Sequence, residues 1–334
     1  MSLKRLSVIF SLLLLVVSAA LPVAGQEPGD VLVDGLVNPR NLSYDSEGNL
    51  YIAETGNGGS LVAASEDAFG ATGQVTMVTS DGERSVVVHG FISMFPGASR
   101  GLQAVEVVGD SMWLALGNSS DLTIPFTSAL VELDRDTGRI KTFVDLLTVE
   151  MTLDPDGNPN SESNPADLAV AEDGTVYVAD ASCNCLISWN SEVGVQVVAA
   201  WSHSDDNPVP TSVEIGPDGD IYVGFLTGFP FPKGSARVER WSGGALVETY
   251  GGLTGVTGLL VTADGTIYAT EFGGEFVMGE GWTPGRVVMV GADGVTPLLE
   301  NLISPFGLAQ SPDGTIVVAV GADSGGGGQV VVVQ

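Results

Sequence analysis

A hairpin motif of about fourteen residues recurs along the chain, and this repeat limits the possible folds more than any other feature. Alternating apolar residues lead into an Asp-Gly or similar turn, and a β-branched and aromatic run follows, as in "SVEIGPDGDIYVGF" at 212–225. Five copies align on a turn glycine, and a degenerate sixth, "VVGDSMWLAL", lies around Asp110; the five glycines are Gly48, Gly174, Gly219, Gly265 and Gly314. The copies lie about 45 to 63 residues apart, which is close to the length of a four-stranded propeller blade with insertions.

Further strand-like segments between the copies bring each unit to four strands. Examples are "GQVTMVTS" and "RSVVVHG" in the first unit and "ARVERW" and "ALVETY" in the fourth. No long segment has helical periodicity, although one helical turn is expected near "FVDLLTVEM". We therefore predict an all-β protein with a single domain over residues 26–334, a six-bladed β-propeller of four-stranded antiparallel blades.

The two ends of the predicted domain complement each other. The last unit contains three strands, "FGLAQ", "TIVVAV" and "QVVVV", and lacks a fourth. The segment "DVLVDGLVNPRNLS" at 30–43 matches "VTPLLENLISPFGLA" at 295–309, in which a fourth strand precedes the first strand of the next blade. Residues 31–34 are therefore expected to complete blade six, which removes open sheet edges.

The first 25 residues read as a secretory signal peptide and are excluded from the predicted fold. Lys4 and Arg5 precede an apolar run and the small-residue stretch "LPVAG". The apolar run is short for a membrane span, so we expect cleavage and a secreted, periplasmic or extracellular protein with no membrane span. Without this segment the chain has 10 basic and 41 acidic residues, a formal charge of −31. Such an acidic protein would repel nucleic acid.

Three segments resemble a known family, namely "SNPADLAVAEDGTVYVAD", "PTSVEIGPDGDIYVGFLTGFPFPKGSARVERW" and "GLVNPRNLSYDSEGNLYIAETGNGG". They are similar to the ScyD/ScyE family of exported bacterial proteins, and the "LTGFPFP" element at 226–232 is the most specific part of the likeness. The resemblance implies a six-bladed, NHL-like propeller and implies no particular reaction.

The long loops are expected on one face of the ring, which is where binding and catalysis usually occur. Two arginines are aligned at the starts of innermost strands on that face, Arg40 and Arg100. A guanidinium there suits a carboxylate or another anion, while the alternative is a local ion pair. The other predicted ligand contacts are Asn41, Asp167, Thr211 and Thr257, with Phe229 and Phe231 as an apolar wall.

Three carboxylates are predicted at the ends of the second strands of blades one, three and five: Glu54, Asp180 and Glu271. Three acids around a channel would suit a hard cation such as calcium. The alternative is that each acid caps backbone N–H groups of its own loop. The loop "DPDGNPNSES" places further oxygens at Asp154, Asp156, Asn158, Asn160 and Glu162, without the order of an EF-hand.

The remaining signals leave two function classes open. Cys183 and Cys185 are the only cysteines, and in an extended strand their Cα atoms would be about 6.6 to 7.2 Å apart, so a disulfide needs a local bend. Triad, phosphate-loop and dinucleotide motifs are missing from the sequence. The favoured interpretation is a propeller that binds a small anionic molecule or a protein at its looped face. The alternative is a metal-dependent enzyme of the lactonase or hydrolase type.

Overall fold

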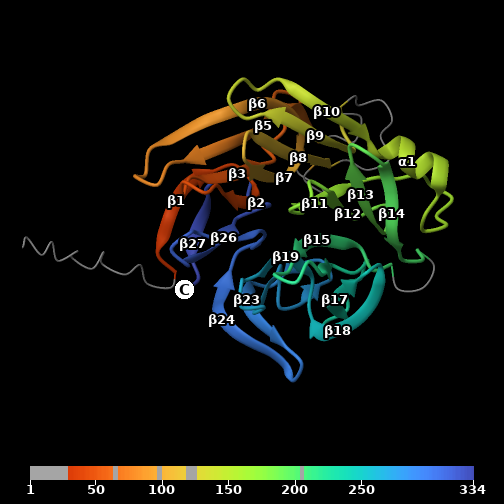
Figure 1. Ribbon diagram of the computed structural model, residues 1–334. Helices are drawn as coiled ribbons and strands as arrows, with labels where there is room; N and C mark the ends of the chain where they lie inside the picture. The colour runs from red at the N-terminus through yellow and green to blue at the C-terminus, as the bar shows by residue number, and fades with distance from the viewer. Residues whose placement is uncertain (1–28, 63–66, 96–99, 118–125, 204–206) are drawn as a thin grey trace, which may run out of the picture.

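The computed structural model describes residues 29–62, 67–95, 100–117, 126–203 and 207–334. Within these residues, six antiparallel sheets form a ring around a central channel (Figure 1). The all-β prediction and the six-bladed propeller are confirmed. The predicted signal peptide at 1–25 lies outside the described residues. No helix in the described part of the chain has the length and apolar character needed to cross a bilayer.

Each blade is named by its order along the chain, and its strands run from the channel to the rim. Blade one contains β2 (Pro39–Tyr44), β3 (Leu50–Glu54), β5 (Ala68–Val78) and β6 (Arg84–Phe95). Blade two contains β7 (Gly101–Val108), β8 (Ser111–Gly117), β9 (Ala129–Asp134) and β10 (Ile140–Asp145). Blade three contains β11 (Pro165–Val170), β12 (Val176–Asp180), β13 (Cys185–Asn190) and β14 (Gly194–Ala200).

The other three blades follow the same order. Blade four contains β15 (Pro210–Ile215), β16 (Ile221–Phe225), β17 (Ala236–Ser242) and β18 (Ala245–Leu253). Blade five contains β19 (Val256–Val261), β20 (Ile267–Glu271), β23 (Gly285–Gly291) and β24 (Gly294–Leu302). Blade six contains β25 (Leu308–Gln310), β26 (Ile316–Val320), β27 (Gly328–Val332) and β1 (Val31–Leu36). Short extra strands are β4 (Leu61–Val62), which pairs with β5, and the hairpin of β21 (Phe276–Val277) and β22 (Gly281–Trp282).

The repeated turn forms as the sequence predicts. The five aligned turn glycines all have positive φ, between 80° and 95°. A side chain at φ in this region is strained, so glycine is the residue that closes these turns at least cost. The degenerate sixth copy also forms a hairpin, with Val108 opposite Ser111.

The ring closes through the predicted pairing of distant segments. β1 runs antiparallel to β27, with Val31 opposite Val331 and Val33 opposite Val330. In Figure 1 the red β1 lies beside the blue β27. Val33 is 6 % exposed and belongs to a core cluster with strands of blades one and six. The prediction that residues 31–34 complete blade six is confirmed.

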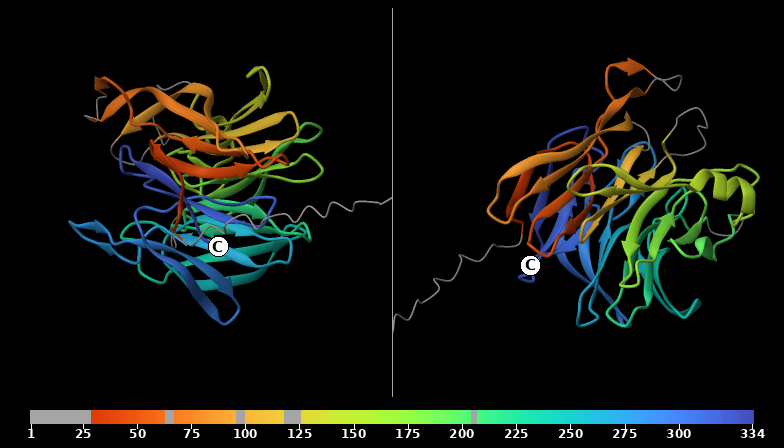
Figure 2. Two further views of the ribbon diagram at one scale, coloured as in Figure 1. Left: turned by 90° about the vertical axis from the view of Figure 1, so that its left-hand side faces the viewer. Right: turned by 45° about the horizontal axis from the view of Figure 1, so that its top comes forward.

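The hydrophobic core lies between the faces of neighbouring blades. Trp113 of blade two and Trp189 of blade three illustrate it, since their ring centroids are 5.3 Å apart within one interblade cluster. Helix α1 (Leu146–Leu153) follows β10 and lies at the rim of the ring (Figures 1 and 2). It corresponds to the helical turn expected near "FVDLLTVEM", and Asp145 caps its first turn by accepting from the backbone N–H of Thr148 at 3.0 Å.

Cys183, in the loop after β12, forms a disulfide with Cys185, the first residue of β13. Their Cα atoms are 5.2 Å apart because Asn184 between them has a left-handed backbone, with φ of 47°. This is the local bend that the sequence spacing requires. Both sulfur-bearing residues are fully buried, so the bridge is part of the core of blade three.

Candidate ligand-binding site

A cavity of about 270 Å³ opens at the looped end of the channel. Five of the six innermost strands, and the segment before the sixth, contribute one equivalent residue each, because every blade enters the ring with the same register. In β2, β11 and β15, the residue just before the lining residue pairs with the last residue of that blade's second strand. In blade one, for example, Pro39 lies opposite Glu54. The resulting ring of lining residues is Arg40, Gln103, Ala166, Thr211, Thr257 and Phe306. The mouth cavity, as we call it, is therefore a direct product of the repeat.

Blade two requires a correction to the sequence alignment, because Gln103 and not Arg100 takes the position of Arg40. In β7, Leu102 pairs with Leu116, the residue before the last one of β8, and the lining residue Gln103 follows directly. The backbone of Arg100 instead pairs with Met94 at the end of β6. Arg100 is thus displaced three residues from the predicted register, and it is not among the described residues that line the mouth cavity.

Arg40 is the buried cation of the mouth cavity. Its side chain is 8 % exposed, and its Nη2 atom lies 2.9 Å from Oδ1 of Asp323. The guanidinium carbon lies 4.4 Å from the centroid of the Phe306 ring. Its Nε atom is buried and has no hydrogen-bond partner among the described residues. Burial lowers the pKa of Arg40, and the charge of Asp323 opposes that shift.

The two predicted threonines line the cavity, but their hydroxyl groups already donate to backbone. Thr211 donates to the carbonyl of Val256 at 2.6 Å, and Thr257 donates to the carbonyl of Pro305 at 3.0 Å. Each bond joins the innermost segments of neighbouring blades. A hydroxyl oxygen that donates one bond keeps lone pairs, so these threonines can still accept a bond from a ligand.

One side of the mouth cavity is aromatic. Phe231, Phe272, Trp282 and Phe306 all line it. The Trp282 ring lies 5.0 Å from the Phe231 ring and 5.7 Å from the Phe272 ring. Phe231 thus lies where the sequence predicts an apolar wall, and its contact with a ligand stays a prediction. Trp282, in the segment at 272–285, was not predicted to line the cavity.

Phe229 does not reach the mouth cavity. Its side chain is 64 % exposed, and it packs on the outer side of Phe231 and on Phe276 at centroid distances of 5.9 and 6.0 Å. Phe231 has a positive φ of 57°, which places neighbouring side chains of the "GFPFP" loop in different directions. The alternation of the two phenylalanines in the sequence gave no signal for this difference.

The three predicted metal ligands occupy equivalent positions, yet each carboxylate is engaged within its own surroundings. Glu54 accepts from the backbone N–H of Val37 at 2.6 Å and from Nε2 of Gln74 at 2.8 Å. Glu271 accepts from the N–H of Thr254 at 2.6 Å and from Nε of Arg286.

Asp180 has the same arrangement in blade three. It accepts four hydrogen bonds, from the Ser163 hydroxyl and from the backbone N–H groups of Asn164, Ser182 and Cys183. None of the three carboxylates is among the described residues that line the mouth cavity. This geometry matches the alternative of loop capping.

Asn41 and Asp167, predicted as ligand contacts, hydrogen-bond to each other below the mouth cavity. Nδ2 of Asn41 donates to Oδ1 of Asp167 at 2.9 Å. Oδ1 of Asn41 accepts from the N–H of Val105 at 3.2 Å, and Oδ2 of Asp167 accepts from the N–H of Val213 at 3.1 Å. The pair therefore connects the innermost strands of blades one to four. Neither residue lines the mouth cavity in the described part of the chain.

A second cavity, of about 300 Å³, lies further along the innermost strands toward the tight-turn face. Its lining includes Asn41, Glu106 and Glu214. Burial raises the pKa of Glu106 to about 7 and that of Asp167 to about 8. Burial and the charges of these two acids raise the pKa of Glu214 well above its ordinary value. In the sequence, Glu106 and Glu214 look like ordinary residues of alternating strands and carry no functional signal.

Comparisons with known proteins agree with this architecture. Residues 163–189, which form most of the inner part of blade three, match the NHL repeat family. Curated protein sequences gave no match. The chain thus contains a recognisable NHL repeat within a six-bladed propeller.

Solved structures of enzymes share the fold at low sequence identity. A gluconolactonase from Xanthomonas campestris superposes with a TM-score of 0.57 at 12% identity, covering 90% of this chain and 88% of that one. A luciferin-regenerating enzyme gives 0.56 at 9% identity, covering 91% and 94% of the two chains. A streptogramin B lyase gives 0.51 at 11% identity, covering 90% and 97%. The neighbours thus include lactonases and lyases, and at these identities the likeness establishes the fold alone.

Proposed function

We propose that this propeller binds a small organic anion, a carboxylate attached to a ring or a short apolar chain, in the mouth cavity. The observation that carries the proposal is the buried Nε–H of Arg40, which has no partner among the described residues. An unpaired buried donor costs about 1 to 3 kcal/mol, so an acceptor at this point would be favourable. The cavity of about 270 Å³ is near the lower end for ligand pockets.

The charges and surfaces around Arg40 support an amphipathic ligand. Asp323 is partly exposed at 41 % of its side chain, so a ligand carboxylate can displace it from the guanidinium at modest cost. The aromatic wall offers Trp282 and Phe231 to an apolar ring. A carboxylate at one end and a ring at the other would satisfy both halves of the cavity.

Calorimetric titration with benzoate and phenylacetate, each compared with its uncharged amide, tests the proposal. We expect the acids to bind, the amides to bind about tenfold or more weakly, and Arg40→Gln to lose acid binding to a similar extent. Arg237→Gln is the matched control. Arg237 also lies over an aromatic ring, Phe225 at 4.3 Å, and pairs with Glu239 at 2.7 Å, outside the mouth cavity. Equal binding of acids and amides would contradict the proposal.

A second candidate function is hydrolysis of a lactone or ester. Glu106 and Glu214 line the second cavity, and Glu106 has a pKa of about 7, where a carboxyl group works well as a general acid or base. The lactonase among the structural neighbours makes this class worth testing. Turnover of simple lactones, with and without added metal, that is lost in Glu106→Gln would favour the enzyme.

We also infer that the chain is exported and belongs to the ScyD/ScyE family. The apolar N-terminal segment and the small residues before Gln26 support export. The "LTGFPFP" element and the opening segment at 35–59 support the family. Both inferences fit a binding protein that meets its ligand outside the cytoplasm.

A further inference from the structure

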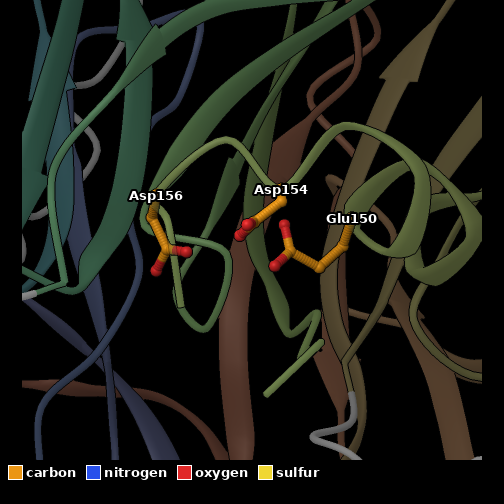
Figure 3. Close-up of side chains that lie close together, drawn as sticks. All are labelled: Glu150, Asp154 and Asp156. Atoms are coloured by element: carbon orange, nitrogen blue, oxygen red, sulfur yellow. The ribbon is translucent and has the colours of Figure 1, made fainter. Parts of the chain in front are cut away.

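Three carboxylates lie together where helix α1 ends, and none of them is among the described residues that line the mouth cavity. One carboxylate oxygen each of Glu150, Asp154 and Asp156 lies within 4.8 Å of the others. Figure 3 shows the Glu150 and Asp154 side chains pointing toward one another, with Asp156 on the following turn of the loop. The sequence predicts possible metal-ligating oxygens in the loop that begins at Asp154. In the structure, the carboxylate of Glu150 on helix α1 joins this group.

Glu150 is the residue that makes this cluster unusual. It is 1 % exposed, and its Oε2 atom is buried with no hydrogen-bond partner among the described residues. A buried carboxylate oxygen surrounded by other acids normally needs a cation or a proton.

The position on the helix adds to the negative potential. Asp154 caps the C-terminus of α1, where its N–H donates to the carbonyl of Glu150 at 2.9 Å. The C-terminal end of a helix carries a partial negative charge and favours cations. No lysine or arginine forms an ion pair with these three acids in the described parts of the chain.

We propose that Glu150, Asp154 and Asp156 bind a calcium ion that fastens the end of α1 to blade three. Calcium takes six to eight oxygen ligands at about 2.3 to 2.6 Å, so two ligands on opposite sides of one ion are roughly 4.6 to 5.2 Å apart. The spacing of the three carboxylates fits within that span. Magnesium requires shorter bonds of about 2.0 to 2.1 Å in a stricter octahedron, so three carboxylates with this spacing suit calcium better.

Asp156 has free lone pairs for the ion and is hydrogen-bonded to blade three. The two oxygens of Asp156 already accept from the N–H of Asn158 at 2.8 Å and from Nδ2 of Asn184 at 3.1 Å. Each oxygen keeps a lone pair for a metal. Asn184 is the residue between the two disulfide cysteines. An ion bound at Asp156 is therefore linked through one hydrogen bond to the buried disulfide of blade three.

Calcium titration of the full chain after EDTA treatment tests the site, by calorimetry and by the thermal unfolding temperature. We expect one calcium per chain and a higher Tm in millimolar calcium, with a smaller effect of magnesium. Glu150→Gln and Asp154→Asn should each weaken calcium binding by about tenfold or more. In EDTA, Glu150→Gln should be at least as stable as the wild type, because it removes the buried charge. Asp293→Asn, at an exposed hairpin turn, is the control and should bind calcium normally.

Three results would overturn the proposal: no calcium-dependent heat or Tm change in the wild type, equal binding of magnesium, or unchanged calcium binding in Asp154→Asn. The last result would place any bound calcium elsewhere on this acidic protein. Asp154 is exposed, so its substitution tests the site even if Glu150→Gln does not fold.

Discussion

Nδ2 of Asn41 on β2 donates a hydrogen bond to Oδ1 of Asp167 on β11, at 2.9 Å, and so joins blade one to blade three inside the channel. Both side chains also accept from backbone N–H groups of the neighbouring blades, Val105 and Val213. The pair is therefore a crosslink of four innermost strands. It lies below the mouth cavity, and Asn41 also lines the second cavity.

This crosslink predicts a strong energetic coupling between the two residues. Asn41→Ala removes the donor to Asp167 and leaves the N–H of Val105 unpaired, so the free energy of unfolding should fall by about 1 to 3 kcal/mol. A double-mutant cycle with Asp167→Ala, measured by denaturant unfolding, should give a coupling energy well above zero. Asn190→Ala, which removes one partly buried bond to Thr175 at 3.2 Å, should cost less. Additive effects would show that the pair is not a crosslink.

The buried acids predict that stability falls as pH rises from weakly acidic to alkaline values. A carboxyl group whose pKa is higher in the folded than in the unfolded chain stabilises the fold below its unfolded pKa, and this contribution is lost as the pH rises through the folded pKa. For Glu106 the window runs from about 4.5 to about 7, which corresponds to a contribution on the order of 3 kcal/mol.

Thermal unfolding measured between about pH 5 and pH 8.5 checks this dependence. Glu106→Gln should flatten the profile, both by removing its own titration and by removing its charge from Asp167 and Glu214. Glu300→Gln, on the exposed edge strand β24, should keep the wild-type profile. A profile of Glu106→Gln that parallels the wild type would contradict the prediction.

Because β1 closes the ring, substitutions of its two valines, Val31 and Val33, should lower the free energy of unfolding by different amounts. Val33 is 6 % exposed and Val31 is 51 % exposed. Val33→Ala should lower the free energy of unfolding by about 1 to 3 kcal/mol, and Val31→Ala should change it little. Deletion of residues 26–36 should lower stability and solubility sharply, because β27 loses its outer partner. Unchanged thermal stability of the deletion variant would mean that the pairing is dispensable.

The aromatic wall predicts which substitution affects ligand binding. Trp282→Ala removes a ring that lines the mouth cavity and should weaken phenylacetate binding by about tenfold, the loss of roughly 1 to 2 kcal/mol of aromatic contact. Phe229→Ala removes an exposed ring outside the cavity and should have little effect. Calorimetric titration of both variants distinguishes them, and a larger loss in Phe229→Ala would move the ligand to the outer side of the "GFPFP" loop.

Export predicts the N-terminus of the mature protein. If the proposed export is correct, the "VAG" triplet predicts cleavage just before Gln26. N-terminal sequencing of the protein from the periplasm or the medium should begin close to Gln26. Retention of Met1 in correctly localised protein would contradict the assignment.

The fold was predictable because each hairpin motif is a pattern of neighbouring residues and because the motif occurs six times in the sequence. Blade count, closure by residues 31–34 and the helical turn near Leu146 all follow from patterns a few residues long. The residues that line the mouth cavity were also predictable in five blades, because equivalent positions of the aligned repeats occupy equivalent places in the ring.

The missed features depend on contacts that sequence spacing does not encode. Arg100 lies three residues before the lining position of blade two, which Gln103 occupies, and its backbone pairs with Met94 of β6. Trp282 reaches the cavity through a separate hairpin, and Glu150 approaches Asp154 across a helix terminus. Cys183 and Cys185 pair because Asn184 adopts a left-handed backbone, which no pattern in the strand predicted.

The pairing of β1 with β27 also sets an order of events for the chain. Val33 and Val330, which meet in one sheet, are separated by almost the whole propeller sequence, and closing so long a loop costs entropy and slows folding. During synthesis, β1 has no partner until β27 has been made.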